Sequence, residues 1–177
     1  MMTHSSDAGT ASIRKAVPND ISSIARIETN PEFRTLVGNW PEDQHRKTLA
    51  DPDAAYWVVE RPTGQVAGFC ILRGLRSEHR SVEIKRIVIA VPNQGVGKRL
   101  LSFVLEQAFG PYRAHRVWLD VFEDNSRARH VYCEIGFRED GVLREAILRD
   151  AKYHSLVLMS LLDIEYWQLK GLSDKNN

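Results

Sequence analysis

Apolar residues along the chain follow two periods, one typical of helices and one typical of strands. A helical period predicts helices at residues 18–30, 41–50, 96–109 and 125–134. Runs rich in β-branched and aromatic residues predict seven strands, at residues 12–16, 56–60, 66–72, 81–91, 117–122, 137–143 and 153–162. The order β-α-α-β-β-β-α-β-α-β-β is typical of an α/β (α+β) sheet with helices on both faces.

The size and charge of the chain narrow the possible classes of protein. Its 177 residues favour one domain, expected at 12–165, with flexible tails at 1–11 and 166–177. Lys and Arg total 24 and Asp and Glu total 23, so nothing favours binding to nucleic acid or to an anionic membrane. The sequence shows neither a secretory signal nor an apolar run long enough to span a bilayer, and we expect a cytoplasmic protein.

The cysteines and histidines give no sign of disulfide or metal chemistry. Cys70 lies in an apolar run and Cys133 in a helical pattern, and we expect both to be reduced, Cys133 as a buried thiol. The six histidines do not have the spacing of metal ligands, so no metal is predicted.

A glycine-bearing turn between a strand and a helix is the most informative segment. The run from Ile87 to Val91 is followed by Gly95-Val96-Gly97 and then by the helix, which has Lys98 and Arg99 in its first turn. Unpaired N–H groups at a helix start, together with glycines that allow close approach, can hold phosphate oxygens. A turn that binds no ligand is the alternative, since the third glycine of a dinucleotide fingerprint is missing.

A second strand-to-helix unit follows at residues 117–134. Asn125, Ala128 and Tyr132 fall on one face of its helix, at spacings of three and four. Two neighbouring units of this kind suggest one elongated cofactor that carries phosphate. A flavodoxin-like nucleotide binder is a weaker alternative, because the hairpin at 56–72 argues against a sheet that is parallel from its start.

With both units in this order, the sequence resembles the GNAT family of N-acetyltransferases from Ile13 to about Leu162. The motifs that carry the resemblance are Arg86-Ile87-Val88-Ile89, then Gln94-Gly95-Val96-Gly97-Lys98-Arg99-Leu100-Leu101, and Asn125-x-x-Ala128-Arg129-x-x-Tyr132-x-x-x-Gly136-Phe137. The resemblance implies a mixed, mostly antiparallel twisted sheet of six to seven strands. This sheet would splay between the strands at 83–91 and 117–122, and acetyl-CoA would lie in the gap.

The resemblance also implies where the coenzyme binds. The strand Ile87-Val88-Ile89 would pair with pantetheine, the backbone of Gln94 to Lys98 would hold the pyrophosphate with Arg99 nearby, and Asn125 and Arg129 would hold the rest. The family has Gln or Arg where this chain has Pro92, and proline has no N–H to offer.

Acetyl transfer from acetyl-CoA to a primary amine needs an acid and a base. Tyr132 occupies the family's tyrosine position and is predicted to protonate the leaving thiolate, while a backbone N–H near Ile89 stabilises the oxyanion. Glu83 is the candidate base, because strand alternation would place it on the face of Ile87 and Ile89. The alternative is a structural Glu83 paired with Lys85 or Arg86, two residues that could instead meet an acidic group on the acceptor.

The acceptor itself stays open at this point. The segment from Asp150 to Leu162 resembles the branch of ribosomal-protein and polyamine acetyltransferases, so a small amine, a polyamine, an amino sugar and a protein N-terminus are all candidates. Trp40 is predicted to contact the acceptor, with a core role as the alternative. A non-catalytic module that senses acyl-CoA is the alternative function, and a homodimer through a late strand and Trp167 is plausible.

Overall fold

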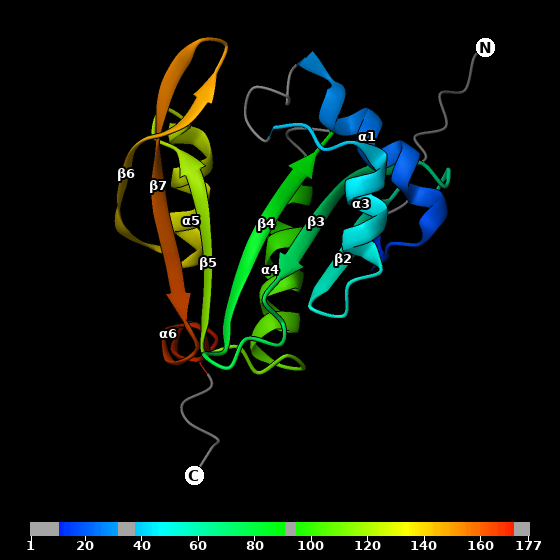
Figure 1. The fold of residues 1–177 in the computed structure, drawn as a ribbon. Helices are drawn as coiled ribbons and strands as arrows, with labels where there is room; N and C mark the ends of the chain where they lie inside the picture. The colour runs from blue at the N-terminus through cyan, green and yellow to red at the C-terminus, as the bar shows by residue number, and fades with distance from the viewer. Residues whose placement is uncertain (1–10, 32–37, 91–94, 172–177) are drawn as a thin grey trace, which may run out of the picture.

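The computed structural model describes residues 11–31, 38–90 and 95–171, which form a seven-stranded sheet in the order β1-β2-β3-β4-β5-β7-β6 (Figure 1). The strands are β1 (Ser12–Lys15), β2 (Ala54–Glu60), β3 (Val66–Arg73), β4 (Ser81–Ile89), β5 (Arg116–Phe122), β6 (Arg138–Arg149) and β7 (Lys152–Leu162). The helices are a 3₁₀ turn η1 (Pro18–Asp20), α1 (Ile21–Thr29), α3 (Glu42–Leu49), α4 (Val96–Phe109), α5 (Ser126–Ile135) and α6 (Asp163–Leu169). The predicted α/β class and the order of elements are confirmed.

Strands β4 and β5 are paired over only a short stretch. Every neighbouring pair in the sheet is antiparallel except this one, which is parallel. The register runs from Ser81 opposite Arg116 to Glu83 opposite Trp118 and stops there. Beyond this point the two strands diverge (Figure 1), which confirms the predicted splay in the middle of the sheet.

A β-bulge in β4 lies next to the point where the strands part. Ile71 of β3 is opposite Arg86, whereas the next residue, Leu72, is opposite Ile84, so Lys85 is the extra residue of β4. A bulge of one residue bends its strand and reverses which residues face each side of the sheet. The bend explains why β4 leaves β5 so soon after Glu83.

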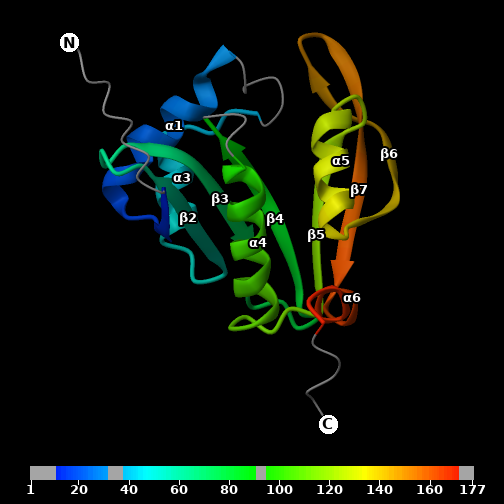
Figure 2. The same ribbon diagram turned by 180° about the vertical axis from the view of Figure 1, so that it is seen from behind.

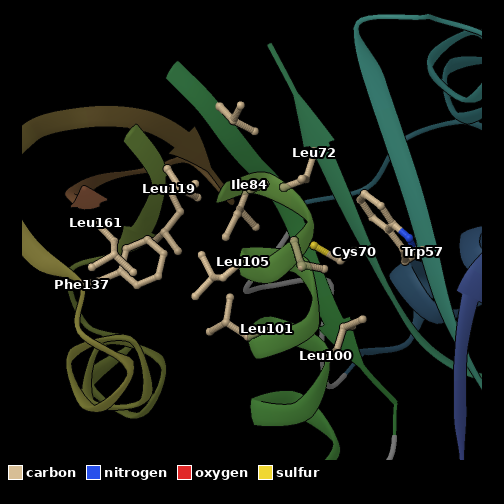
Figure 3. Packing of buried hydrophobic residues seen from close by; sticks show 14 of the residues in the cluster. Trp57, Cys70, Leu72, Ile84, Leu100, Leu101, Leu105, Leu119, Phe137 and Leu161 are labelled. Carbon is tan, nitrogen blue, oxygen red and sulfur yellow. The ribbon is translucent and has the colours of Figure 1, made fainter. Parts of the chain in front are cut away.

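Helices cover both faces of the sheet. Helices α1 and α3 lie on one face, and α4 and α5 lie on the other (Figures 1 and 2). The leucine face of α4 is buried because Leu100, Leu101 and Leu105 pack against β3, β4 and β5 (Figure 3). Burial of each such side chain contributes roughly 2 kcal/mol. This packing fixes the start of α4 beside the gap between β4 and β5.

The C-terminal part of the chain contains more regular structure than its sequence pattern indicated. Helix α6 runs from Asp163 to Leu169, so the expected domain end at residue 165 falls inside a helix. Its Tyr166 is buried and stacks on Phe109, with 4.7 Å between ring centroids. The pattern was missed because α6 has only seven residues, too few to show a clear period.

The two cysteines differ in exposure. Cys70 is buried and free, whereas Cys133 is free but exposed, so the expectation of a buried Cys133 was wrong. It lies on an exposed part of α5. No helix in the described part of the chain is both long and apolar enough to cross a membrane.

Candidate active site between strands β4 and β5

A cavity of about 660 Å³ occupies the gap between the diverging halves of β4 and β5. The bulge at Lys85 determines which side chains of β4 line each side of the cavity. Lys85 itself lines the cavity at the bulge. The α4–α5 side is lined by Ile84, Ile87, Ile89, Gly95, Val96, Gly97, Lys98, Leu101, Leu119, Val121, Asn125, Arg127, Ala128, Val131 and Tyr132. The α1–α3 side is lined by Gly38, Trp40, Arg86, Val88, Asp120, Phe122, Ile147, Arg149 and Leu156. The opening therefore passes from one face of the sheet to the other.

The start of α4 forms one end of the cavity. Gly95 is the N-cap, with a φ of +68°, and the first helical hydrogen bond runs from the N–H of Arg99 to the carbonyl of Gly95. The N–H groups of the three residues between them thus have no partner within the helix. A Cβ added at Gly95 would meet nothing within 4 Å, so there is room for an anion at this helix start. Pro92 and Gln94 lie outside the described residues.

The structure separates the predicted basic residues into two groups. Lys98 lines the cavity and forms an ion pair with Glu134 at 2.7 Å. Arg99 and Arg129 do not line it: Arg99 donates to the carbonyl of Ala11, and Arg129 donates to Glu139 at 2.7 Å. The hydrogen bond to Glu139 raises the pKa of Arg129. Arg127, which the motif did not single out, lines the cavity instead.

Helix α5 places Asn125 and Tyr132 on the cavity wall. The Asn125 side chain caps the helix by accepting a hydrogen bond from the N–H of Ala128 at 3.1 Å. Gly136 ends the helix in the left-handed region, as predicted, with a φ of +113°. Tyr132 lies against the core beside Phe137, and burial raises the pKa of its hydroxyl, with smaller contributions from Cys70 and Asp120. The phenol therefore stays protonated at neutral pH.

Glu83 does not share the face of Ile87 and Ile89. The predicted alternation assumed an unbroken strand, but the bulge at Lys85 reverses the parity between them. Glu83 lies opposite Arg73 on the α1–α3 face, and its carboxylate contacts the Lys85 ammonium at 3.0 Å. The face prediction was thus wrong, and Glu83 is outside the set of residues that line the cavity.

Asp120 is a cavity residue that the sequence reasoning missed. It lies in β5 between buried Leu119 and Val121, exposed on the α1–α3 side. In the part of the chain that the structure describes, its carboxylate makes no hydrogen bond or ion pair, and its charge acts on both Tyr132 and Arg86. An acidic residue in the middle of an apolar strand was the available signal, because such a residue needs a reason to be there.

Trp40 and Arg86 form the wall opposite Asp120. The Arg86 guanidinium lies 4.4 Å from the centre of the Trp40 ring and donates to the carbonyl of Gly38. Behind it, the fully buried Glu28 pairs with Arg86 at 3.2 Å and also contacts His45. Burial lowers the pKa of Arg86, and the charge of Glu28 opposes that effect. Trp40 thus lines the cavity where acceptor contact was predicted.

No grouping of three or more His, Cys, Asp or Glu side chains suited to a metal ion occurs within the described residues. The expectation of a metal-independent site stays a prediction.

Comparisons with known proteins match both the fold and the cavity region. A family model described as the acetyltransferase (GNAT) family matches residues 21–137. The spermidine N(1)-acetyltransferase of Vibrio cholerae is 31% identical over 127 residues, 71% of this chain and 73% of that protein. The L-amino acid N-acetyltransferase AaaT of Escherichia coli is 30% identical over 148 residues, 80% of this chain and 91% of that protein.

A solved structure shows the same architecture. The spermidine N-acetyltransferase of Vibrio cholerae, crystallised in complex with CoA and spermine, superposes with a TM-score of 0.79 and 25% identity. The match covers 88% of this chain and 97% of that one. The residues matched by the family model include β4, the start of α4, β5 and α5, which together build the cavity.

Proposed function

Because this chain belongs to the acetyltransferase (GNAT) family, we propose that it transfers the acetyl group of acetyl-CoA directly to the primary amine of a small molecule. The observation that carries the proposal is the cavity between β4 and β5, which begins at the glycine-bearing start of α4 and reaches both faces of the sheet. Such a cavity can hold two substrates with their reacting groups adjacent, and proximity alone supplies much of the rate of a reaction between them.

The residues on the α4–α5 side fit a long, phosphate-bearing thioester. Acetyl-CoA would supply the acetyl group in activated form. The open N–H groups at the start of α4 would hold its pyrophosphate, with Lys98 and Arg127 nearby. The backbone of β4 beyond Glu83 is not paired with β5, and it would pair with the amide groups of pantetheine. Asn125 completes this side as the cap of α5.

Two side chains would move the protons of the reaction. The Asp120 carboxylate would take a proton from the ammonium form of the acceptor, directly or through a water molecule, which leaves the nitrogen lone pair free to attack. A backbone N–H of β4 near Ile89 would donate to the developing oxyanion. The Tyr132 hydroxyl would give its proton to the thiolate that departs as the C–S bond breaks, and burial keeps that hydroxyl protonated beforehand. The resulting phenolate would recover a proton from the cationic nitrogen of the intermediate. The products are the acetylated amine and the free thiol.

The proposal also covers the class of acceptor, the cellular compartment and the oligomeric state. The relatives named above act on a polyamine in one case and on L-amino acids in the other, which supports a small-molecule acceptor. The exposed, unpaired thiol of Cys133 supports a reducing compartment, so we place the enzyme in the cytoplasm. A homodimer stays a prediction; β6 is an edge strand that a second copy could meet.

The test is an initial-rate assay of thiol release from acetyl-CoA with a panel of primary amines. Wild-type protein should release thiol only when an amine is present. Tyr132→Phe should lower kcat by about 10²-fold while the affinity for coenzyme A, measured by calorimetry, stays within about twofold. Tight coenzyme binding without thiol release for any amine would instead support a module that senses acyl-CoA.

A further inference from the structure

Two arginine side chains from opposite walls of the cavity both reach Gly38. A Cβ added at Gly38 would lie 3.3 Å from Nη2 of Arg149 and 3.7 Å from Nη2 of Arg86. The two Nη2 atoms are therefore separated by at most the sum of 3.3 and 3.7 Å. Burial lowers the pKa of Arg86, and the charge of Arg149 adds a smaller effect in the same direction, as expected for like charges near one another.

The surrounding residues hold both guanidinium groups in position. Arg86 is 8% exposed and is fixed by Glu28, by the carbonyl of Gly38 and by the ring of Trp40. The Arg149 guanidinium lies 4.7 Å from the centre of the Phe122 ring. Both arginines line the cavity, so a ligand on the α1–α3 side meets this pair. Convergent guanidinium groups in a partly enclosed site are suited to a carboxylate.

A negative charge lies a short distance along the same wall. Among the described residues that line the cavity, Asp120 carries the one carboxylate. It is two residues before Phe122 on β5, and residues at this spacing lie on the same face about 7 Å apart. The α1–α3 side of the cavity, where the acceptor would bind, thus has a positive end at Arg149 and Arg86, with Glu28 offsetting the charge of Arg86 from behind, and a negative point at Asp120.

From this separation of charge we infer that the acceptor is an amino acid or a similar amine that carries a carboxylate. Its amino group would lie at Asp120 and its carboxylate at Arg149 and Arg86. The inference rests on the proposed acetyl transfer and names its substrate class. A polyamine fits less well, because its further ammonium groups would approach two guanidinium groups. Apolar side chains at Phe122, Ile147 and Leu156 favour an acceptor with a hydrocarbon side chain.

The test compares acceptors that differ only in the carboxylate. L-leucine is paired with isoamylamine and L-phenylalanine with phenethylamine, and spermidine is added as the polyamine. For wild-type protein we expect kcat/KM to be at least about tenfold higher for the amino acid of each pair. Arg149→Met should remove this preference by lowering kcat/KM for the amino acid, while the value for the matched amine stays unchanged or rises. Arg149→Lys should restore part of it.

Arg144→Met serves as the control, since Arg144 is on the same strand as Arg149 but does not line the cavity. It should keep the wild-type preference, and thermal unfolding of each variant checks that it is folded. Preference for spermidine or for the decarboxylated amines, or an equal loss for both members of a pair in Arg149→Met, would overturn the inference while leaving acetyl transfer intact. If no amine is acetylated, the proposed function fails. Calorimetric binding of L-leucine against isoamylamine then still decides the inference.

Discussion

The Nη1 atom of Arg86 lies 3.2 Å from Oε1 of Glu28, and this pair joins helix α1 to the wall of the cavity. Glu28 has no exposed surface, and its other carboxylate oxygen accepts a hydrogen bond from the N–H of Trp40. One buried carboxylate thus positions both the arginine and the tryptophan of the acceptor side. The arrangement links the stability of the fold to the shape of the site.

Removing one member of this pair should destabilise the protein strongly. Glu28→Gln leaves the buried Arg86 charge without its counter-charge, which should lower the free energy of unfolding by about 3 kcal/mol. The double variant Glu28→Gln/Arg86→Met removes both charges and should lose less than the sum of the single variants. Urea denaturation measures all three. Additive losses would show that the two charges are not coupled.

The ion pair near the first strand should make stability depend on pH. Arg14 donates two hydrogen bonds to Asp20, at 2.7 and 2.9 Å, and these lower the pKa of Asp20 from its ordinary value near 3.8. The pair therefore stabilises the fold fully above the unfolded pKa and loses that effect as the pH falls through the lower, folded pKa.

Accordingly, Asp20→Asn should lower the free energy of unfolding by about 1 kcal/mol at pH 7, and the difference from wild type should shrink below about pH 4. Urea denaturation between pH 3 and 7 gives both curves. A difference that grows as the solution is acidified would mean that the sign of the linkage is wrong.

The basic residues near the coenzyme should differ in importance. Arg127 lines the cavity, whereas the Arg129 guanidinium is bonded to Glu139 and to the carbonyl of Glu123. Arg127→Gln should raise the Kd for coenzyme A by about fivefold, and Arg129→Gln should change it by less than about twofold. Calorimetric titration compares the two variants. The reverse order would restore the role that the family motif implies for Arg129.

Asp120 and Glu83 form a second matched comparison. Asp120→Asn keeps the shape of the side chain but removes the proton acceptor, and should lower kcat by about 10²-fold at pH 7. Glu83→Gln should lower it by less than about threefold, because the Glu83 carboxylate pairs with Lys85 and does not itself line the cavity. Raising the pH should rescue part of the loss in Asp120→Asn, since more of the amine is then already neutral. A larger loss for Glu83→Gln would make Glu83 the base.

The period of the apolar residues was enough to predict those elements that pack against the sheet with one apolar face. Helix α4 was predicted to the residue, because its leucines recur along one face and glycines flank it at 95 and 110. The splay between β4 and β5 could be predicted too, although it came from resemblance to the GNAT family rather than from the pattern. The family itself is confirmed by the match over residues 21–137.

Two features of the site could not be predicted from the sequence, because one is an irregularity within a strand and the other joins distant segments of the chain. The bulge at Lys85 leaves no clear mark in the sequence, yet it moves Glu83 to the opposite face from Ile87. The approach of Arg149 to Arg86 joins residues that are far apart in the chain, so no local pattern contains it. Both observations decide which side chains form the acceptor side.

A crystal structure of the protein with coenzyme A bound is the most direct check of the cavity between β4 and β5. We expect the pantetheine arm between the two strands beyond Glu83, the pyrophosphate on the N–H groups of Val96 to Lys98, and the thiol near Tyr132. Coenzyme bound away from this gap, or β4 and β5 paired along their whole length, would contradict the proposed site.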